Sequence, residues 1–326
     1  MLRLRHREIF LKGAYMIKSK KLATTVVVPA DVPEYSCDEY IKNFTAITHN
    51  TGRLFMFAAD QKIEHLNQDF YGPHIDRQAN DPEHIFRVAQ DGSIGALAIH
   101  AGLIARYGRK YQDINYIVKL NGKSNVVNSQ EFDPISDWMW DVNNVLNLAL
   151  DNNINIRGIG YTIYLGSEHE HVMLQNAAQL VIQAHHAGLI AILWVYPRAR
   201  HIVDTSAPEL IAGAAGIGNA LGADFVKVHV PHAQETVSSM QAVKIATEAA
   251  GNTGVICSGG EYISTDELLK NIHEQIYEGG TSGCAIGRNI FQRSYTDAVA
   301  LTKAISAIVY KEASLPEAKK LFGKVR

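Results

Sequence analysis

Eight short apolar runs alternate with longer amphipathic stretches along this chain, and no other property of the sequence limits its fold as strongly. The alternation begins at Leu54, and most runs are followed by a segment whose apolar residues recur at helical spacing. This arrangement is typical of successive βα units around a parallel sheet. The apolar runs cover residues 54–60, 96–102, 116–122, 158–166, 189–197, 224–231, 254–260 and 283–289.

Parallel strands of this number, joined by helical crossovers, close into a barrel more readily than they form an open sheet, because closure leaves no edge unpaired. Two helix starts carry acidic signals: Ser167 with Glu170 fits a capping box, and Asp266 and Glu267 fit a first turn. The sequence therefore predicts an α/β fold, a (β/α)₈ TIM barrel. Its helices are expected over residues 136–152, 175–187, 208–221, 236–250, 266–277 and 297–310.

The first fifty residues differ from the rest of the chain because they show little periodicity and contain Pro29 and Pro33. The chain has 326 residues, a length at which an α/β barrel routinely forms one domain. We expect residues 1–50 to be an N-terminal extension packed on the barrel, and residues 51–326 to form the barrel itself.

Charge and cysteine content limit the classes of macromolecule that the protein can bind and the cellular compartment in which it works. The formal net charge is −2, whereas a sequence-independent hold on nucleic acid or a membrane surface needs a concentrated basic face. No apolar run is long enough for a transmembrane helix, and no signal peptide is recognised. Cys37, Cys257 and Cys284 lack the spacing of a disulfide framework or a zinc site. We predict a cytoplasmic protein without nucleic-acid or membrane partners.

Lys227 is the first candidate for chemistry, since it lies inside the apolar run DFVKVHVP. A buried ammonium is costly, so the pKa of such a lysine falls and its neutral amine becomes a nucleophile. The alternative is a lysine that snorkels out from a strand end. Barrel active sites lie at the carboxyl ends of the strands, where the other polar residues are Asp60, His100, Lys119, Tyr164, Trp194, Tyr196, His229, Ser258 and Arg288.

Lys119, in the run YIVKLNG, is the rival of Lys227. It is a second nucleophile, a cation that lowers the pKa of Lys227, or an ion-pair partner, and the last is the most common role of such a lysine. We rank it second and include it among the substrate-binding candidates.

Trp194, Tyr196 and Arg198 alternate in LWVYPRAR, so they project to the same side of the strand if the strand extends that far. A tyrosine there can reach a substrate hydroxyl and act as an acid or base, with the tryptophan as an apolar wall. The plainer alternative is a core aromatic pair beside a loop arginine.

The last two runs end in Ser258-Gly259-Gly260 and in Gly287-Arg288. Loops after the seventh and eighth strands of such barrels commonly bind phosphate through backbone N–H groups, and an arginine adds a charge-assisted contact. One Gly-Gly pair usually marks only a turn. Two such signals on consecutive strands predict a phosphorylated substrate.

Asp60 ends the first run, where it handles protons near the amine, holds Lys227 electrostatically or, as is more common at a strand end, caps a helix. Glu64, His65, His169 and His171 suggest a metal site, but they lack HExxH-type spacing, and SEHEH is explained by helix capping. His185 and His186 are expected to be structural residues in the middle of a helix. We predict neither a metal nor a cofactor.

Taken together, the motifs AADQKIEH, WVYPR, DFVKVHVP, CSGG and GRNIFQR resemble the class I fructose-bisphosphate aldolases of the archaeal and bacterial DhnA-like family over about residues 54–295. The resemblance implies that Lys227 forms the Schiff base, that Tyr196 transfers protons, and that Trp194 and Asp60 complete the centre. Phosphate binding is implied for Gly259, Gly260, Gly287 and Arg288. The chain departs from compact members in its N-terminal extension and its longer segment from residue 61 to about 82.

The resemblance thus implies a cytoplasmic homo-oligomer of glycolysis and gluconeogenesis, which reversibly cleaves fructose 1,6-bisphosphate to dihydroxyacetone phosphate and glyceraldehyde 3-phosphate. The nearest alternative is another Schiff-base lyase or transferase for phosphorylated sugars, such as a deoxyribose-phosphate aldolase or an amino-sugar-forming aldolase. A non-catalytic sugar-phosphate-binding barrel would need neither Lys227 nor Tyr196. A metal-dependent aldolase would lose its activity to a strong chelator.

Overall fold

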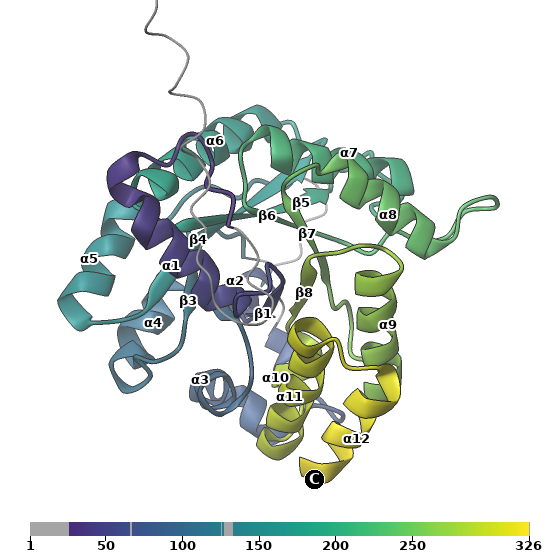
Figure 1. Cartoon of the computed structure of the whole chain (residues 1–326). Coiled ribbons are helices and arrows are strands. Elements are labelled where there is room, and N and C mark those ends of the chain that lie inside the picture. The colour runs from purple at the N-terminus through teal and green to yellow at the C-terminus, as the bar shows by residue number, and fades with distance from the viewer. Residues whose placement is uncertain (1–25, 66, 125, 127–132, 326) are drawn as a thin grey trace, which may run out of the picture.

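The computed structural model describes residues 26–65, 67–124, 126 and 133–325. Its strands form a closed barrel in which each strand pairs in parallel with its neighbours in chain order and β8 returns to β1 (Figure 1). The predicted (β/α)₈ barrel is therefore confirmed. The strands are β1 (Leu54–Ala58), β2 (Ala96–His100), β3 (Tyr116–Lys119), β4 (Ile156–Leu165), β5 (Ile190–Pro197), β6 (Phe225–Val228), β7 (Gly254–Ser258) and β8 (Gly283–Ile286).

Each of the eight predicted runs overlaps one strand, although β4 begins two residues before its run and most strands end before the run does. β3, for example, ends at Lys119, although Leu120 and Asn121 remain fully buried beyond it. The run is longer than the strand because the first loop residues stay buried: Leu120 packs in the cluster between strands and helices, and the Asn121 amide donates to the Ser136 and Thr162 carbonyls. Apolar patterning reports burial, and burial continues here after the strand pairing stops.

Helices surround the strands, as Figure 1 shows. The predicted crossovers correspond to α5, α6, α7, α8, α9 and α11. The helices are α1 (Cys37–Thr48), α2 (Gln61–Glu64), α3 (Pro82–Asp91), α4 (Ala101–Tyr107), α5 (Val142–Asn152), α6 (Glu170–His186), α7 (Pro208–Ala220), α8 (Ser239–Ala249), α9 (Thr265–Tyr277), α10 (Arg288–Phe291), α11 (Tyr295–Lys311) and α12 (Leu315–Val325).

Helix starts show where local signals succeed and fail. Asp266 and Glu267 lie in the first turn of α9 as predicted. The helix predicted from residue 136 instead begins at Val142, because the Asp141 side chain caps it by accepting a hydrogen bond from the Asn144 N–H at 2.7 Å. The predicted cap at Ser167 is wrong: its hydroxyl donates to the Pro134 carbonyl at 2.7 Å, and α6 begins three residues later.

The core has two parts, which follow from the alternation of side chains along each strand. Phe55 and Phe57 of β1 belong to the cluster between the strands and the surrounding helices, whereas Leu54 and Met56 belong to the cluster inside the barrel. All four side chains are fully buried. The interior is therefore a packed core rather than a channel, and only its two ends are available for a site.

Helix α1 was not predicted, and it crosses the N-terminal opening of the barrel (Figure 1). The Tyr40 hydroxyl donates to Asp224 at 2.5 Å, and the Asn43 amide donates to the Gly188 carbonyl at 2.9 Å. Residues 1–25 of the predicted extension lie outside the described residues. Among the described helices, none combines the length and hydropathy needed to cross a membrane.

Candidate active site

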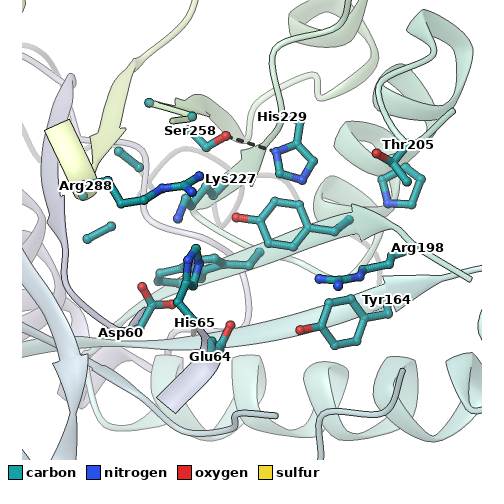
Figure 2. Close-up of a pocket in the computed structure, with 18 residues that line it drawn as sticks. Asp60, Glu64, His65, Tyr164, Arg198, Thr205, Lys227, His229, Ser258 and Arg288 are labelled. Carbon is teal, nitrogen blue, oxygen red and sulfur yellow. Dashed lines mark hydrogen bonds between the residues drawn. The ribbon is translucent and has the colours of Figure 1, made fainter. Parts of the chain in front are cut away.

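A cavity of about 430 Å³ opens at the carboxyl ends of the strands (Figure 2). Every residue that was assigned a catalytic or binding role lines this cavity, with Lys119 as the exception. His100, suspected only from its strand position, does not line it. The barrel thus brings together side chains that are separated by more than 200 positions in the sequence. The lining residues are Ala58, Asp60, Glu64, His65, Tyr164, Trp194, Tyr196, Pro197, Arg198, Thr205, Lys227, His229, Ser258, Gly259, Gly260, Ala285, Gly287 and Arg288.

Lys227 projects from β6 into this cavity (Figure 2) and is only 6% exposed. Its strand neighbour on β5 is Trp194, and its amine lies 5.3 Å from the centre of the indole ring. Burial lowers the pKa of Lys227, and the cations Lys119 and Arg288 lower it further, against the opposing effect of nearby carboxylates. The neutral amine is therefore more available than that of an ordinary lysine, as nucleophilic catalysis requires.

Lys119 is fully buried at the end of β3 and is not part of the cavity wall. Its ammonium donates to the Glu64 carboxylate and to the Asn121 carbonyl at 3.1 Å, and it lies 3.8 Å from Asp60. This geometry supports the ion-pair role considered for Lys119, together with an effect on the pKa of Lys227. It does not support direct contact between Lys119 and a bound substrate.

Asp60 lies two residues after the end of β1, 3.8 Å from the Lys119 amine. Lys227 is beyond ion-pair distance but still acts on Asp60 electrostatically. Burial alone would raise its pKa, but Lys227 and Lys119 reverse that effect, so the pKa of Asp60 is lowered from its ordinary value. Asp60 is thus a permanent carboxylate between two amines. It fits an electrostatic role better than the helix-capping role.

Glu64 is a residue of the site that the sequence analysis considered only as a metal ligand. It lies at the end of α2, one helical turn after Asp60, and its side chain is 10% exposed. Burial and the Asp60 carboxylate raise the pKa of Glu64, while Lys119 and Lys227 oppose that rise. The four-residue spacing from Asp60 was the signal in the sequence that both carboxylates share one face.

Tyr196 lines the cavity with its ring stacked on His229, at 4.4 Å between ring centres. Burial raises the pKa of Tyr196 well above 10, with Asp60 and Glu64 adding to the effect. Burial and the nearby cation of Lys227 lower the pKa of His229 to about 4. At neutral pH the phenol therefore carries its proton and the imidazole is uncharged, with Nδ1 of His229 3.2 Å from the Ser258 hydroxyl.

The loops after β7 and β8 form the opposite wall of the cavity. Gly260 has a φ of +65°, a conformation that favours glycine, and a side chain at Gly259 would come within 2.9 Å of Ile286. The Gly259 N–H donates to the Ala285 carbonyl at 3.0 Å, so this group, expected to bind phosphate, is used within the barrel. Arg288 points its guanidinium toward Lys227 (Figure 2) and lies 3.9 Å from Asp69.

The remaining histidines and acids predicted as alternatives are separated. His65 pairs with Asp69 at 2.6 Å, and His169 pairs with Glu168 at 3.5 Å on the rim. Within the described part of the chain, no three His, Cys, Asp or Glu side chains gather as a potential metal site. His185 and His186 are the last residues of α6 rather than the middle of a helix.

Comparison with known proteins agrees with this geometry. The family model described as DeoC/LacD family aldolase matches residues 54–293, which is most of the chain and includes the whole cavity. A protein from Methanocaldococcus jannaschii named fructose-bisphosphate aldolase/6-deoxy-5-ketofructose 1-phosphate synthase is 46% identical over 310 residues, covering 95% of this chain and 98% of that protein. A class 1 fructose-bisphosphate aldolase from Thermoproteus tenax is 33% identical over 281 residues, covering 85% and 97%.

Solved structures extend the similarity to three dimensions. A fructose-bisphosphate aldolase from Slackia heliotrinireducens superposes with a TM-score of 0.90 at 49% identity, covering 92% of this chain and 95% of that one. An archaeal fructose-1,6-bisphosphate aldolase, solved with its catalytic lysine covalently bound to the carbinolamine intermediate, gives a TM-score of 0.69 at 30% identity and covers 83% and 99%. The chain belongs to the DeoC/LacD family of aldolases.

Proposed function

We propose that this protein is a class I aldolase that reversibly cleaves fructose 1,6-bisphosphate to dihydroxyacetone phosphate and glyceraldehyde 3-phosphate. One observation carries the proposal: the amine of Lys227 lies in a cavity that also holds Arg288, a cation suited to a sugar phosphate. The lowered pKa of Lys227 and the names of the relatives support the same reaction.

In the proposed mechanism Lys227 attacks the C2 carbonyl, and loss of water gives a protonated imine. The imine withdraws electrons as the C3–C4 bond breaks, so no metal Lewis acid is needed to stabilise the carbanion. Tyr196 exchanges a proton with the C4 oxygen: its phenol donates that proton during condensation, and the resulting phenolate takes it back during cleavage. Asp60, a permanent carboxylate, stabilises the cationic imine, and Trp194 forms the apolar wall beside it.

The cavity has a cation at each end, which supports a bisphosphate. Arg288 and Gly260 lie beside Lys227 on the side of β7 and β8, where we propose that the C1 phosphate binds. Arg198 follows β5 on the other side, 5.8 Å from the Tyr164 ring, and no carboxylate among the described residues pairs with it. We assign the C6 phosphate to that side.

A second activity is favoured by the name of the 46%-identical relative, which includes 6-deoxy-5-ketofructose 1-phosphate synthase. A product of that name would form when the enamine of dihydroxyacetone phosphate adds to a three-carbon aldehyde that carries a ketone and no phosphate. Arg198 would have no phosphate to bind in that reaction, while Lys227 and Arg288 would keep their roles. Formation of the product from dihydroxyacetone phosphate and 2-oxopropanal is the assay that tests it.

The proposed function has a direct chemical test. Borohydride should trap dihydroxyacetone phosphate on the protein as a stable amine, and mass mapping should find it on Lys227. The same preparation should cleave fructose 1,6-bisphosphate in the presence of a strong chelator. Failure of both trapping and cleavage would refute the proposal, whereas trapping with a different sugar product would point to another Schiff-base aldolase.

We further propose that the protein is a cytoplasmic homo-oligomer acting in glycolysis and gluconeogenesis, with residues 1–50 as an extension of a barrel formed by residues 51–326. The free thiols of Cys37, Cys257 and Cys284 fit a reducing compartment. Light scattering measures the oligomeric state, and removal of residues 1–50 tests whether the barrel folds without them.

A further inference from the structure

Two amines and two carboxylates are buried together at the carboxyl end of the barrel, and two of these four groups change their charge during the proposed reaction. Lys119 and Asp60 keep their charges throughout the reaction: Lys119 is enclosed by carboxylates, and Asp60 remains ionised between the two lysines. The charges of Lys227 and Glu64 change. The groups that interact electrostatically with Glu64 come from several elements and include Asp60, Lys119, Tyr164, Tyr196 and Lys227.

Charge balance links the proton on Glu64 to the state of Lys227. Before attack Lys227 must be neutral, so the Lys119 cation and the Asp60 anion already cancel, and a neutral Glu64 leaves no excess charge among these four groups. The nearby Arg288 cation has its own carboxylate, Asp69, at 3.9 Å. After the imine forms, its positive charge needs a second anion, which ionised Glu64 supplies. An uncompensated charge is strongly unfavourable at a buried site, so the two changes should occur together.

We propose that Glu64 is a catalytic acid and base, which protonates the carbinolamine hydroxyl on Lys227 and thereby forms the imine. This inference rests on the proposed Schiff-base function. In the step, the carboxyl proton of Glu64 moves to the carbinolamine oxygen, the C2–O bond breaks, and water leaves. The nitrogen lone pair completes the C=N bond, and Glu64 becomes the carboxylate that balances the iminium. Hydrolysis of the product imine runs the same step backward.

The neighbouring groups are less suited to this proton transfer. Asp60 has a lowered pKa and holds its proton too weakly, while the raised pKa of Tyr196 leaves its phenol a weak acid. Glu64 lines the cavity, burial raises its pKa, and Lys119 holds its carboxyl group in place through a hydrogen bond. A general acid works best when its pKa lies near the working pH.

The decisive variant is Glu64→Gln, which keeps the shape and removes the transferable proton. We expect the rate of imine formation with dihydroxyacetone phosphate, measured by rapid borohydride quenching, to fall on the order of 10²–10⁴-fold. In the wild type this rate should fall as pH rises through the pKa of Glu64, because the acid form is the active one. Glu64→Gln should lose that alkaline decline. Glu168→Gln, the same change at an exposed carboxylate on the rim, should keep both the rate and the pH profile.

A second variant separates catalysis from a purely structural ion pair. Glu64→Ala should regain imine formation when acetate is added, with a pH dependence set by acetate. If Glu64 served only as a structural ion-pair partner of Lys119, acetate would not restore the rate. Should Glu64→Gln unfold, Glu64→Asp replaces it as the test variant. We expect Glu64→Asp to form the imine more slowly and to keep the decline of the rate at alkaline pH. Wild-type trapping rates in Glu64→Gln, or no acetate rescue together with an unchanged pH profile, would overturn the inference. Absence of trapping in the wild type would instead refute the Schiff-base function.

Discussion

The two ends of the barrel each contain a buried cluster of charged side chains, and the clusters behave in opposite ways. At the N-terminal end, His185 lies between Asp31 at 2.8 Å and Asp224 at 3.2 Å, and Asp224 also accepts a hydrogen bond from Tyr40. At the carboxyl end, no carboxylate of the described residues lies within ion-pair distance of the Lys227 amine. His185 thus has direct carboxylate partners, whereas Lys227 has none among the described residues.

The pKa values follow this difference. Burial opposes a charge on His185, but the hydrogen bonds that its ring donates to two carboxylates outweigh this effect and raise the pKa of His185 to about 9. Burial of Lys227 meets only more distant carboxylates, so its pKa is lowered. A direct partner turns a buried cation into a stabilising contact, whereas its absence leaves a reactive amine. The cluster at the N-terminal end thus stabilises the fold, whereas the cluster at the carboxyl end supplies a reactive amine.

The largest expected effect is at Lys227. Lys227→Met keeps an apolar chain of similar length, so we expect normal folding and a loss of cleavage on the order of 10⁴-fold or more. Circular dichroism checks the fold and a coupled assay checks the cleavage. Borohydride trapping that persisted on Lys119 in this variant would reverse the roles assigned to the two lysines.

Tyr196→Phe tests whether chemistry at this end depends on the hydroxyl or only on the ring. The stacking on His229 should survive, while kcat should fall on the order of 10²–10⁴-fold because a proton-transfer group is lost. Imine trapping by borohydride should continue. An unchanged kcat with a higher KM would make Tyr196 a binding residue.

The N-terminal cluster should affect stability and leave the chemistry alone. A histidine pKa raised from 6.5 to about 9 corresponds to about 3 kcal/mol of unfolding free energy. Because the protonated form is favoured in the folded state, this contribution is complete below pH 6.5 and disappears as pH rises through 9. Urea unfolding at pH 6.5 and at pH 10 measures it, relative to His185→Gln, which cannot titrate. An equal pH dependence in both proteins would contradict the comparison.

The smallest effects should come from the two arginines of the cavity. Arg288→Ala removes one charge-assisted contact to the C1 phosphate, so binding should weaken by about 1.5–3 kcal/mol for both fructose 1-phosphate and fructose 1,6-bisphosphate. Arg198→Ala should weaken binding of the bisphosphate alone. If Arg288→Ala affected only the bisphosphate, the substrate would lie in the opposite orientation; no effect on either sugar would move the phosphate site elsewhere.

Much of the fold was determined by the sequence. The apolar runs that predict β1 to β8 are near-continuous because a strand of a parallel barrel is buried on both faces, and such patterns are strong. Lys227 was recognisable for the same reason, since one charge interrupts an otherwise apolar run. Helix α1 was missed although its apolar periodicity is no weaker than that of the predicted helices α6 and α7. The prolines before it obscured the pattern, and its buried face became evident only from the barrel opening that it covers (Figure 1).

The site needed the tertiary structure for its partners. The sequence determined that two lysines would lie in strands, but not that Glu64 and Asp60 would hold Lys119 and leave Lys227 without an ion-pair partner. Nor did it predict that His185 would meet Asp31 across more than 150 residues. Burial patterns are repeated along the chain and can be read locally. The pKa of a buried group depends on distances to charges from distant segments, and those distances exist only after the barrel has closed.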